Sequence, residues 1–219
     1  AAALSVAERM TVCNMGVEMD AKAAVFRPDD TVREFLQGKK TDEAQCIWAD
    51  EDAQYTRTIE IDLEQIEACV AQPSRVDNYC PLRKLEHVPV DQAFIGACTN
   101  GRLEDIRVAA EILRGKRVAV RTIIMPASCK VLEDAAKEGL ILELIEAGCT
   151  IMPPGCGPCV GASGGVLADG ETCISSSNRN FVGRMGSKKG RVYLASPATV
   201  AASALCGAIT AWKPEESNV

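Results

Sequence analysis

The sequence predicts an α/β protein with a mostly parallel β-sheet covered by helices. Between residues 92 and 206, short apolar and β-branched stretches alternate with longer amphipathic ones, which is typical of parallel strands joined by helices. The composition agrees, because hydrophobic residues make up 47% and charged residues 25% of the 219 residues, close to the averages of globular domains. A chain of this length has room for one large domain or two smaller ones.

The first third of the chain predicts a smaller α/β domain. Ser5 and Glu8 form a capping-box pattern that predicts a helix at the start of the chain. Residues 57–62 alternate polar and apolar side chains and predict a strand, and residues 63–72 predict a returning helix. A cluster of Pro, Ser and Asn then predicts a linker. The expected domains are therefore residues 1–82 and residues 83–219.

The second domain carries the strand–helix alternation. Strands are expected at residues 92–97, 116–125, 150–152, 172–175 and 192–195. Helices are expected at residues 103–113, at 131–147 with a break or bend at Gly139, and from Ser196 onward. Parallel sheets bind ligands in the loops at the carboxyl ends of their strands. The loops with the most unusual residues in this sequence follow three of those strands.

Charge and hydropathy exclude several functions. The net charge of −6 argues against a nucleic-acid partner. The charge is uneven, with −8 on the first 74 residues and +2 on the rest, so a small anionic substrate should meet the second part. No apolar run reaches the roughly 18–20 residues of a membrane span, and we expect no membrane partner and no signal peptide.

The eleven cysteines are the second compositional signal. Most of them lie in apolar stretches, such as Cys69 and Cys206, and are expected to be small buried hydrophobic residues. The chain is longer and richer in aliphatic residues than a secreted disulfide scaffold. We therefore expect a reducing, cytoplasmic location, with a few cysteines reserved for a metal or a cluster.

The sharpest local motif is the pair Cys156-Gly157-Pro158-Cys159 in a loop of glycines and prolines. Two thiolates at this spacing can share one metal or one cluster. Zinc would need two further Cys or His ligands, and the one histidine, His87, has no ligand-like neighbours. A thioredoxin-type pair usually begins a helix, whereas prolines stiffen this turn. An iron–sulfur site, a zinc site, a redox pair and structural thiols all remain open on this motif alone.

Cys98 adds a third candidate ligand. It follows the strand expected at 92–97, in the turn Cys98-Thr99-Asn100-Gly101, where a loop would face a ligand. A cubane cluster held by three cysteines leaves one iron without a protein ligand. That iron can act as a Lewis acid on a substrate hydroxyl. Taken by itself, Cys98 is equally well explained as a buried thiol.

The third motif is the polar loop at residues 175–184. Arg179 and Arg184 lie five positions apart in it, and each guanidinium can bind a carboxylate in bidentate fashion. Without the cysteines, a solvated basic loop explains these arginines better. Together with the cysteines, they predict a site for a small carboxylate substrate.

These three segments, in this order and spacing, resemble the aconitase family of iron–sulfur hydro-lyases. The resemblance rests on IGACTNGRLEDIRVAAEILRGKRV, on the stretch from Cys149 to Cys159, and on CISSSNRNFVGRMG followed by VYLASPATVAASAL. The stretch MTVCNMGVE near the start is similar to a family segment that lines the active site. The resemblance covers almost the whole chain and implies aconitase-like three-layer domains.

The resemblance also implies roles for individual residues. Cys98, Cys156 and Cys159 match the three thiolate ligands of a 4Fe-4S cluster with one iron free of protein ligands. Asn14 and Asn178 match asparagines beside the cluster, and Glu18 matches an acidic residue near the iron-bound hydroxyl. Arg179 and Arg184 match arginines that hold substrate carboxylates. Ala97 departs from the family pattern, since many relatives carry Ser there.

The function implied is part of a hydro-lyase that isomerises isopropylmalate in leucine biosynthesis by dehydration and rehydration. Homoaconitase, another hydratase of the family, and a non-catalytic iron–sulfur or zinc-binding domain are the alternatives. In the family, further His and Asp residues come from an N-terminal domain of the same subunit, and a small subunit or swivelling domain supplies the catalytic serine. We therefore expect this chain to turn over a dicarboxylate or tricarboxylate substrate only with those partners.

Overall fold

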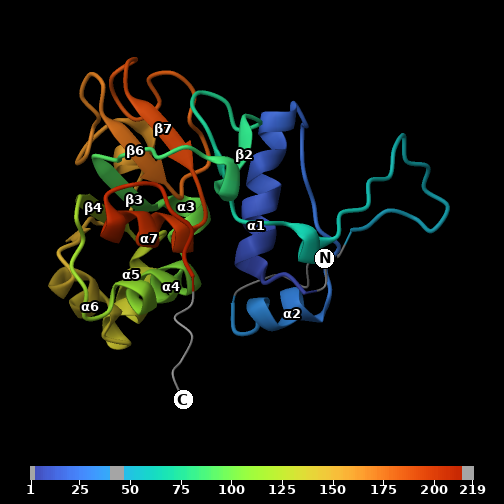
Figure 1. Cartoon of the computed structure of the whole chain (residues 1–219). Helices are drawn as coiled ribbons and strands as arrows, with labels where there is room; N and C mark the ends of the chain where they lie inside the picture. The colour runs from blue at the N-terminus through green and yellow to red at the C-terminus, as the bar shows by residue number, and fades with distance from the viewer. Residues whose placement is uncertain (1–2, 40–46, 214–219) are drawn as a thin grey trace. The chain divides into compact units, whose positions relative to one another are not determined.

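The computed structural model describes residues 3–39 and 47–213 (Figure 1). The chain divides into two compact units, residues 1–67 and residues 68–219, and each is described by itself. The division falls earlier in the chain than the expected boundary at residue 82. The reason is that two short strands, β1 (Cys69–Ala71) and β2 (Tyr79–Pro81), pair with the sheet of the second unit.

The second unit is built on a seven-stranded sheet in the order β2-β1-β7-β6-β3-β4-β5. The remaining strands are β3 (Gln92–Gly96), β4 (Arg121–Met125), β5 (Thr150–Ile151), β6 (Thr172–Ser175) and β7 (Arg191–Leu194). These five are parallel to one another, and β1 and β2 add an antiparallel edge. The chain leaves β3 towards β4 and β5 on one side and later returns to β6 and β7 on the other. Loops that diverge from neighbouring strands in this way leave a crevice at their carboxyl ends.

Helices connect most of these strands. They are α3 (Ala97–Asn100), α4 (Leu103–Leu113), α5 (Cys129–Lys137), α6 (Leu140–Glu146) and α7 (Pro197–Cys206), with short 3-10 turns η3 (Leu82–Lys84) and η4 (Gly157–Val160). The break expected at Gly139 is confirmed, since this residue separates α5 from α6 with a φ of 79°. Ser128 and Ser196 cap α5 and α7 through their side-chain oxygens. Each described helix is too short or too polar to cross a bilayer.

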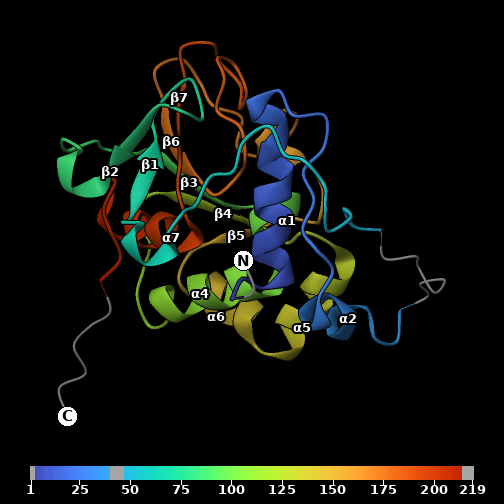
Figure 2. The same cartoon turned by 90° about the vertical axis from the view of Figure 1, so that its right-hand side faces the viewer.

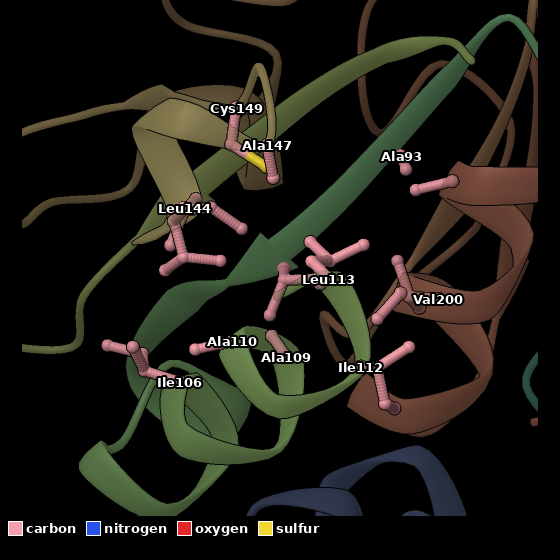
Figure 3. Close-up of a cluster of buried hydrophobic side chains, with 14 of the residues drawn as sticks. Ala93, Ile106, Ala109, Ala110, Ile112, Leu113, Leu144, Ala147, Cys149 and Val200 are labelled. Atoms are coloured by element: carbon pink, nitrogen blue, oxygen red, sulfur yellow. The ribbon is translucent and has the colours of Figure 1, made fainter. Parts of the chain in front are cut away.

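Alternation along the strands separates two cores. On one face, Ala93 of β3 packs with Ile106 and Leu113 of α4, Leu144 of α6 and Val200 of α7 (Figure 3). On the other face, side chains of the sheet pack against loop residues; this cluster includes Phe94, Ile123, Met125, Cys159, Leu167, Cys173, Met185 and Val192. Helices therefore cover one face, and the long loops that follow β5 and β6 cover the other. The predicted α/β class with a mostly parallel sheet is confirmed.

The first unit consists of α1 (Val6–Met15), η1 (Gly16–Met19), α2 (Asp30–Leu36) and η2 (Leu63–Gln65). The capping box at Ser5 and Glu8 is formed, with Ser5 N donating to Glu8 Oε2 at 2.7 Å. Arg9 of α1 is buried and donates two 2.8 Å hydrogen bonds to the carboxylate of Asp29, which caps α2. This bidentate pair links the two helices, which are labelled α1 and α2 in Figure 2.

Two expectations for this region are wrong. Residues 57–62 are extended but pair with no strand within the described residues. The helix expected over residues 63–72 is replaced by η2 and then β1. Its apolar spacing suited a helix, but Val70 is instead buried between β2 and the rest of the sheet.

Candidate functional site

The loop after β3 presents Cys98. Gly96 ends the strand, Ala97 is buried with a left-handed φ of 74°, and Cys98 is exposed at the start of α3. The loop is fastened to the one after β6, because Gly96 N donates to Ser176 Oγ at 3.0 Å and Asn100 Nδ2 donates to Ser176 O at 2.7 Å. The two loops that diverge at the switch in strand order are thus held together at the carboxyl edge of the sheet.

The loop after β5 presents the other two candidate ligands. Cys156 is exposed before η4, and Cys159 is buried within it. This loop and the Cys98 loop both close on Met125, the last residue of β4. A Cβ at Gly157 would clash with Met125 Cε, and a Cβ at Gly101 would clash with Met125 O. Glycine at these positions therefore allows both cysteine-bearing loops to approach one point of the sheet.

Cys159 contacts two of the other predicted site residues. Its thiol donates to Asn178 Oδ1 at 4.0 Å, and Arg184 Nη2 donates to Cys159 Sγ at 3.6 Å. Asn178 is buried in the loop after β6, and Arg184 is half-buried further along that loop. Asn178 and Arg184, which follow Cys159 by 19 and 25 positions in the sequence, are thereby hydrogen-bonded to it.

Arg184 retains an unused donor. Its guanidinium lies 5.3 Å from the ring centroid of Phe181, and its Nε is buried without a hydrogen-bond partner among the described residues. A buried donor left unpaired costs about 1–3 kcal/mol, so an anion that accepts from Nε would be favoured here. Arg179, the other predicted carboxylate-binding residue, is half-buried in the same loop.

Asn14 and Glu18 lie in the first unit. Asn14 is half-buried near the end of α1, and Glu18 is exposed in η1. The structure therefore brings together Cys159, Asn178 and Arg184 by direct contact, and it brings the Cys98 loop to them through Ser176. The roles expected for Asn14 and Glu18 stay predictions.

Two other cysteines, Cys149 and Cys173, lie in the two apolar cores. Burial raises the pKa of the Cys149 thiol to about 12, and it raises that of Cys173 to about 12 as well. Both stay protonated at neutral pH, which suits a packing role. The expectation that Cys69 and Cys206 are buried is wrong, since Cys69 is half-buried and Cys206 is exposed. Cys46 lies outside the described residues.

The residue types at this edge of the sheet are those that an iron–sulfur cluster would need. Three thiols come from two loops that share Met125, one of them accepts an N–H from Arg184, and a buried asparagine lies beside it. Hydrogen bonds to cysteine sulfur are a known means of tuning such clusters. Within residues 3–39 and 47–213, no three His, Cys, Asp or Glu side chains group closely enough to hold one metal ion. A cubane cluster places each cysteine on a different iron, so its ligands need not converge on one ion.

Sequence reasoning missed the residues that join these loops. Ser176 accepts a hydrogen bond from the Cys98 loop through its hydroxyl group. Asn180 Nδ2 donates to Gln72 O at 2.8 Å and to Val192 O at 3.3 Å. Both lie in the quoted polar segment, yet nothing in the run of three serines indicates which hydroxyl turns inward. Met125 carried no signal, because it ends an ordinary apolar strand.

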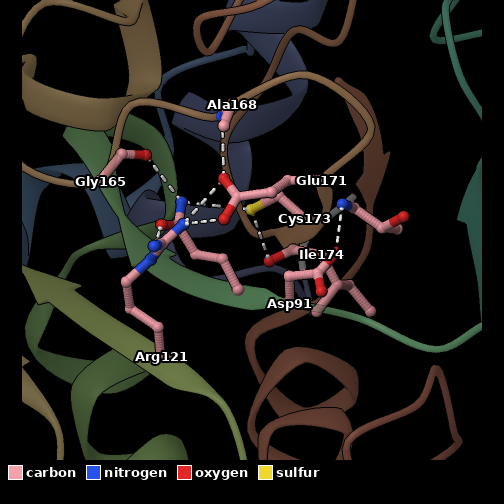
Figure 4. Close-up of polar contacts among 9 residues, drawn as sticks. Asp91, Arg121, Gly165, Ala168, Glu171, Cys173 and Ile174 are labelled. Atoms are coloured by element: carbon pink, nitrogen blue, oxygen red, sulfur yellow. Dashed lines mark hydrogen bonds and ion pairs between the residues drawn. The ribbon is translucent and has the colours of Figure 1, made fainter. Parts of the chain in front are cut away.

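A polar network around the buried Gln92, at the amino ends of the strands, holds the loop that carries Cys156 and Cys159 (Figure 4). Gln92 is fully buried, donates through Nε2 to Gly165 O at 2.9 Å and accepts from Arg121 Nε at 2.6 Å. Arg121 Nη2 also donates to both carboxylate oxygens of Glu171, at 3.1 and 3.2 Å. The connection from β5 to β6 crosses the sheet face without an α-helix, and this network fixes its far end.

Comparison with known proteins identifies relatives that match almost the whole chain. The sequence model described as the aconitase family (aconitate hydratase) matches residues 1–207. A probable methanogen homoaconitase large subunit from Methanosarcina mazei is 53% identical over 207 residues, which is 94% of this chain. A 3-isopropylmalate dehydratase large subunit from Methanopyrus kandleri is 47% identical over 96% of the chain, and a homoaconitase large subunit from Thermus thermophilus is 49% identical over 99%. The chain spans about half the length of these relatives, at 53%, 51% and 50% respectively.

Proposed function

Because the chain belongs to the aconitase family, we propose that it forms part of an iron–sulfur hydro-lyase that isomerises a hydroxy acid. The reaction removes water from the substrate and adds it back across the neighbouring carbon. One observation supports the proposal most directly: Cys159, Asn178 and Arg184 meet at the carboxyl edge of the sheet, beside the loop that bears Cys98.

Cys98, Cys156 and Cys159 would hold a 4Fe-4S cluster in this proposal. When bound, such a cluster supplies a Lewis-acidic iron that makes hydroxide a better leaving group. Asn178 lies against Cys159 and would orient groups beside the cluster. A reducing compartment such as the cytoplasm would keep these thiols available, and every described cysteine is a free thiol.

The arginines would bind and orient the substrate. Arg184 has a buried Nε–H that donates to no acceptor within the described chain and could donate to a carboxylate oxygen. Arg179 lies in the same loop and would hold a second carboxylate. The proton to be removed lies next to a carboxylate, so negative charge develops on the oxygens that these guanidinium groups would contact. Fixed positive charge at that position lowers the barrier and sets the substrate's orientation.

The remaining groups would come from elsewhere. We propose that Asn14 and Glu18 of the first unit contribute to the network of polar groups around the substrate hydroxyl. A small subunit or swivelling domain would supply the serine base, in keeping with the name "large subunit" that the relatives carry. An N-terminal domain of the same subunit would supply further His and Asp side chains.

The substrate is proposed to be isopropylmalate, which would place the chain in leucine biosynthesis. Homoaconitase is the second candidate, because relatives at 53% and 49% identity bear that name. The two candidates share the carboxylates that Arg179 and Arg184 would bind, and they differ in the side chain that a partner subunit would meet. Binding of isopropylmalate and of homocitrate to the reconstituted chain with a small subunit separates them.

Anaerobic reconstitution with iron and sulfide tests the proposal. We expect a brown protein with about four irons per chain, and loss of the colour in Cys98→Ala and in Cys159→Ala. The matched control is Cys129→Ala, which removes an exposed thiol outside the three motifs and should leave the iron count unchanged. Uptake of zinc without iron, or a cluster that persists in Cys98→Ala, would contradict the three-thiolate site.

A further inference from the structure

Asn180 is a buried polar side chain that the proposed function does not use. It lies between the two arginines of the loop after β6, directly after Arg179 and four positions before Arg184. Asn180 is only 2% exposed, whereas the next two residues, Phe181 and Val182, are exposed. The loop therefore passes from the interior to the surface at Asn180, and its exposed part begins there.

The side-chain amide of Asn180 joins three segments of backbone. Its Nδ2 donates to Gln72 O at 2.8 Å, to Arg75 O at 3.4 Å and to Val192 O at 3.3 Å. Gln72 follows β1, Arg75 lies in the turn between β1 and β2, and Val192 belongs to β7. Hydrogen bonds are directional, so these contacts fix the arginine loop against the turn between β1 and β2.

The surroundings determine which way this amide points. In the reverse orientation, Oδ1 would face three carbonyl oxygens, and none of these groups has a proton to donate. In the orientation found, Oδ1 is buried and has no hydrogen-bond partner among the described residues. A buried acceptor without a partner is destabilising. The contacts of Nδ2 must therefore outweigh this loss for the orientation to persist.

A short turn connects Asn180 to the guanidinium of Arg184. Arg184 N donates to Phe181 O at 2.9 Å, and the guanidinium lies 5.3 Å from the Phe181 ring centroid. After the turn, Met185 is buried in the loop-covered core. The guanidinium itself donates through Nη2 to Cys159 Sγ. The position of Arg184 thus depends on where the chain enters the turn, and Asn180 fixes that point.

We propose that Asn180 is a positioning residue for substrate binding. Its contacts with the turn between β1 and β2 hold Arg179 and Arg184 where their guanidinium groups bind the carboxylates of one substrate. The inference rests on the proposed function and extends its carboxylate site to an edge of the sheet. Bidentate binding of a carboxylate needs a defined direction of the guanidinium. Loss of the anchor should therefore lower the affinity for a carboxylate substrate while the positive charge remains.

NMR relaxation of the full 219-residue chain, without cluster or substrate, tests the anchor itself. In Asn180→Ala we expect the backbone order parameters of residues 181–184 to fall from about 0.85 to below about 0.6. Those of β3 should stay unchanged. A residue that only stabilises the fold would leave the order parameters of the folded state unchanged at both places, because they report motion on the ps–ns timescale and not the unfolding equilibrium.

Asn78 provides the matched control. It is exposed in the same turn between β1 and β2, and its Nδ2 donates to Pro73 O at 2.9 Å, within that turn. Asn78→Ala removes the same chemical group from the turn and leaves the contacts of Asn180 in place. The order parameters of residues 181–184 should therefore equal those of the unaltered chain.

Binding of isopropylmalate to the reconstituted chain with a small subunit tests the consequence for the substrate. Calorimetry at a temperature where every variant is folded should give at least about tenfold weaker binding for Asn180→Ala and for Arg184→Met. Asn78→Ala should bind within about twofold of the unaltered chain. The iron count of Asn180→Ala should not change, because all three candidate ligands remain.

Two outcomes overturn the inference. One is an order parameter profile over residues 181–184 that is the same in Asn180→Ala and in Asn78→Ala. The other is unchanged affinity in Asn180→Ala when Arg184→Met has lost binding. Failure of the proposed function looks different, because Arg184→Met would then bind isopropylmalate as tightly as the unaltered chain, while the order parameters would still fall in Asn180→Ala.

Discussion

At the scale of single residues, the environment separates cysteines that have the same side chain. Cys173 is fully buried, and desolvation raises its pKa to about 12, so it packs as a neutral thiol. Cys159 is also buried, but it lies against the guanidinium of Arg184 and the amide of Asn178. An N–H directed at the sulfur is a contact that a cluster ligand also accepts. The same residue type therefore packs at one position and is suited to ligation at the other.

Gly161 provides a test of how closely the cysteine loop and the arginine loop must approach. A Cβ at Gly161 would lie 2.9 Å from Gly186 N and 3.2 Å from Arg184 O. Both are backbone atoms that cannot rotate away. Gly161→Ala should therefore push the loop that carries Arg184 away from Cys159. Urea unfolding should show that the free energy of unfolding falls by about 2–5 kcal/mol, because left-handed backbone strain and overpacking add together.

Gly170→Ala is the matched control. Gly170 has a φ of 84°, similar to the 66° of Gly161, but no atom lies within 4 Å of its ideal Cβ. This variant should lose only the about 1–2 kcal/mol of left-handed strain. It should also keep its iron on reconstitution, whereas Gly161→Ala should retain less. Equal stabilities for the two variants would mean that the close approach at Gly161 is unimportant.

Much of the candidate site could be predicted from residue spacing, but its contacts could not. Cys98, Cys156, Cys159 and Arg184 stood out because unusual residues followed expected strands. The hydrogen bond from Arg184 to Cys159 depends on how a long loop returns across the sheet. No local pattern encodes that path.

At the scale of elements, strands with buried neighbours were predicted well and the isolated ones were not. The strand at residues 172–175 is confirmed with the expected bounds, and all four of its residues are buried between β3 and β7. Residues 57–62 carry a good strand pattern, yet a strand also needs a partner. The helix expected over residues 63–72 failed for a related reason, since pairing with β2 and β7 overrides the helical spacing around Val70.

The pair of Arg9 and Asp29 sets the acid response of the two helices in the first unit. The hydrogen bonds from Arg9 lower the pKa of Asp29 from 3.8 to about 2. A carboxyl group whose pKa is lower in the folded state contributes stability above its unfolded pKa, and this contribution is lost as pH falls towards the folded value. We therefore expect the contact between α1 and α2 to weaken between about pH 4 and pH 2.

Carboxyl NMR titration measures this directly. Asp29 should titrate near pH 2 in the unaltered chain and return towards its ordinary value in Arg9→Met, where the cap to Val32 N remains possible. Arg33→Met is the control, since it removes an exposed arginine paired with Asp30 instead. If Asp29 titrates at its ordinary value with Arg9 present, the bidentate contact does not form in solution.

At the scale of the whole molecule, the fold class followed from the strand–helix rhythm, but the division of the chain did not. The linker signals around Pro73 and Pro81 correctly indicate a turn, yet that turn joins β1 to β2 inside the second unit. Turn residues indicate where a chain reverses, and only the pairing of the flanking strands determines whether the reversal separates domains. The unit boundary therefore depends on the contacts of β1 with β7, which lies more than a hundred residues away.

The second unit has two apolar cores, whereas only Arg9 and Gly16 are buried among the described residues of the first unit. We therefore expect the first unit to unfold locally before the second. Trypsin should cleave after Arg57, in the extended segment of the first unit, long before it cleaves after Lys130 on α5, although both side chains are exposed. Cleavage at Lys130 requires local unfolding of α5, which packs on the helix-covered face of the sheet, whereas cleavage at Arg57 requires no unfolding of a helix. Mass spectrometry over a time course should show a resistant fragment beginning at Thr58. Equal rates at the two sites would mean that the first unit is as stable as the second.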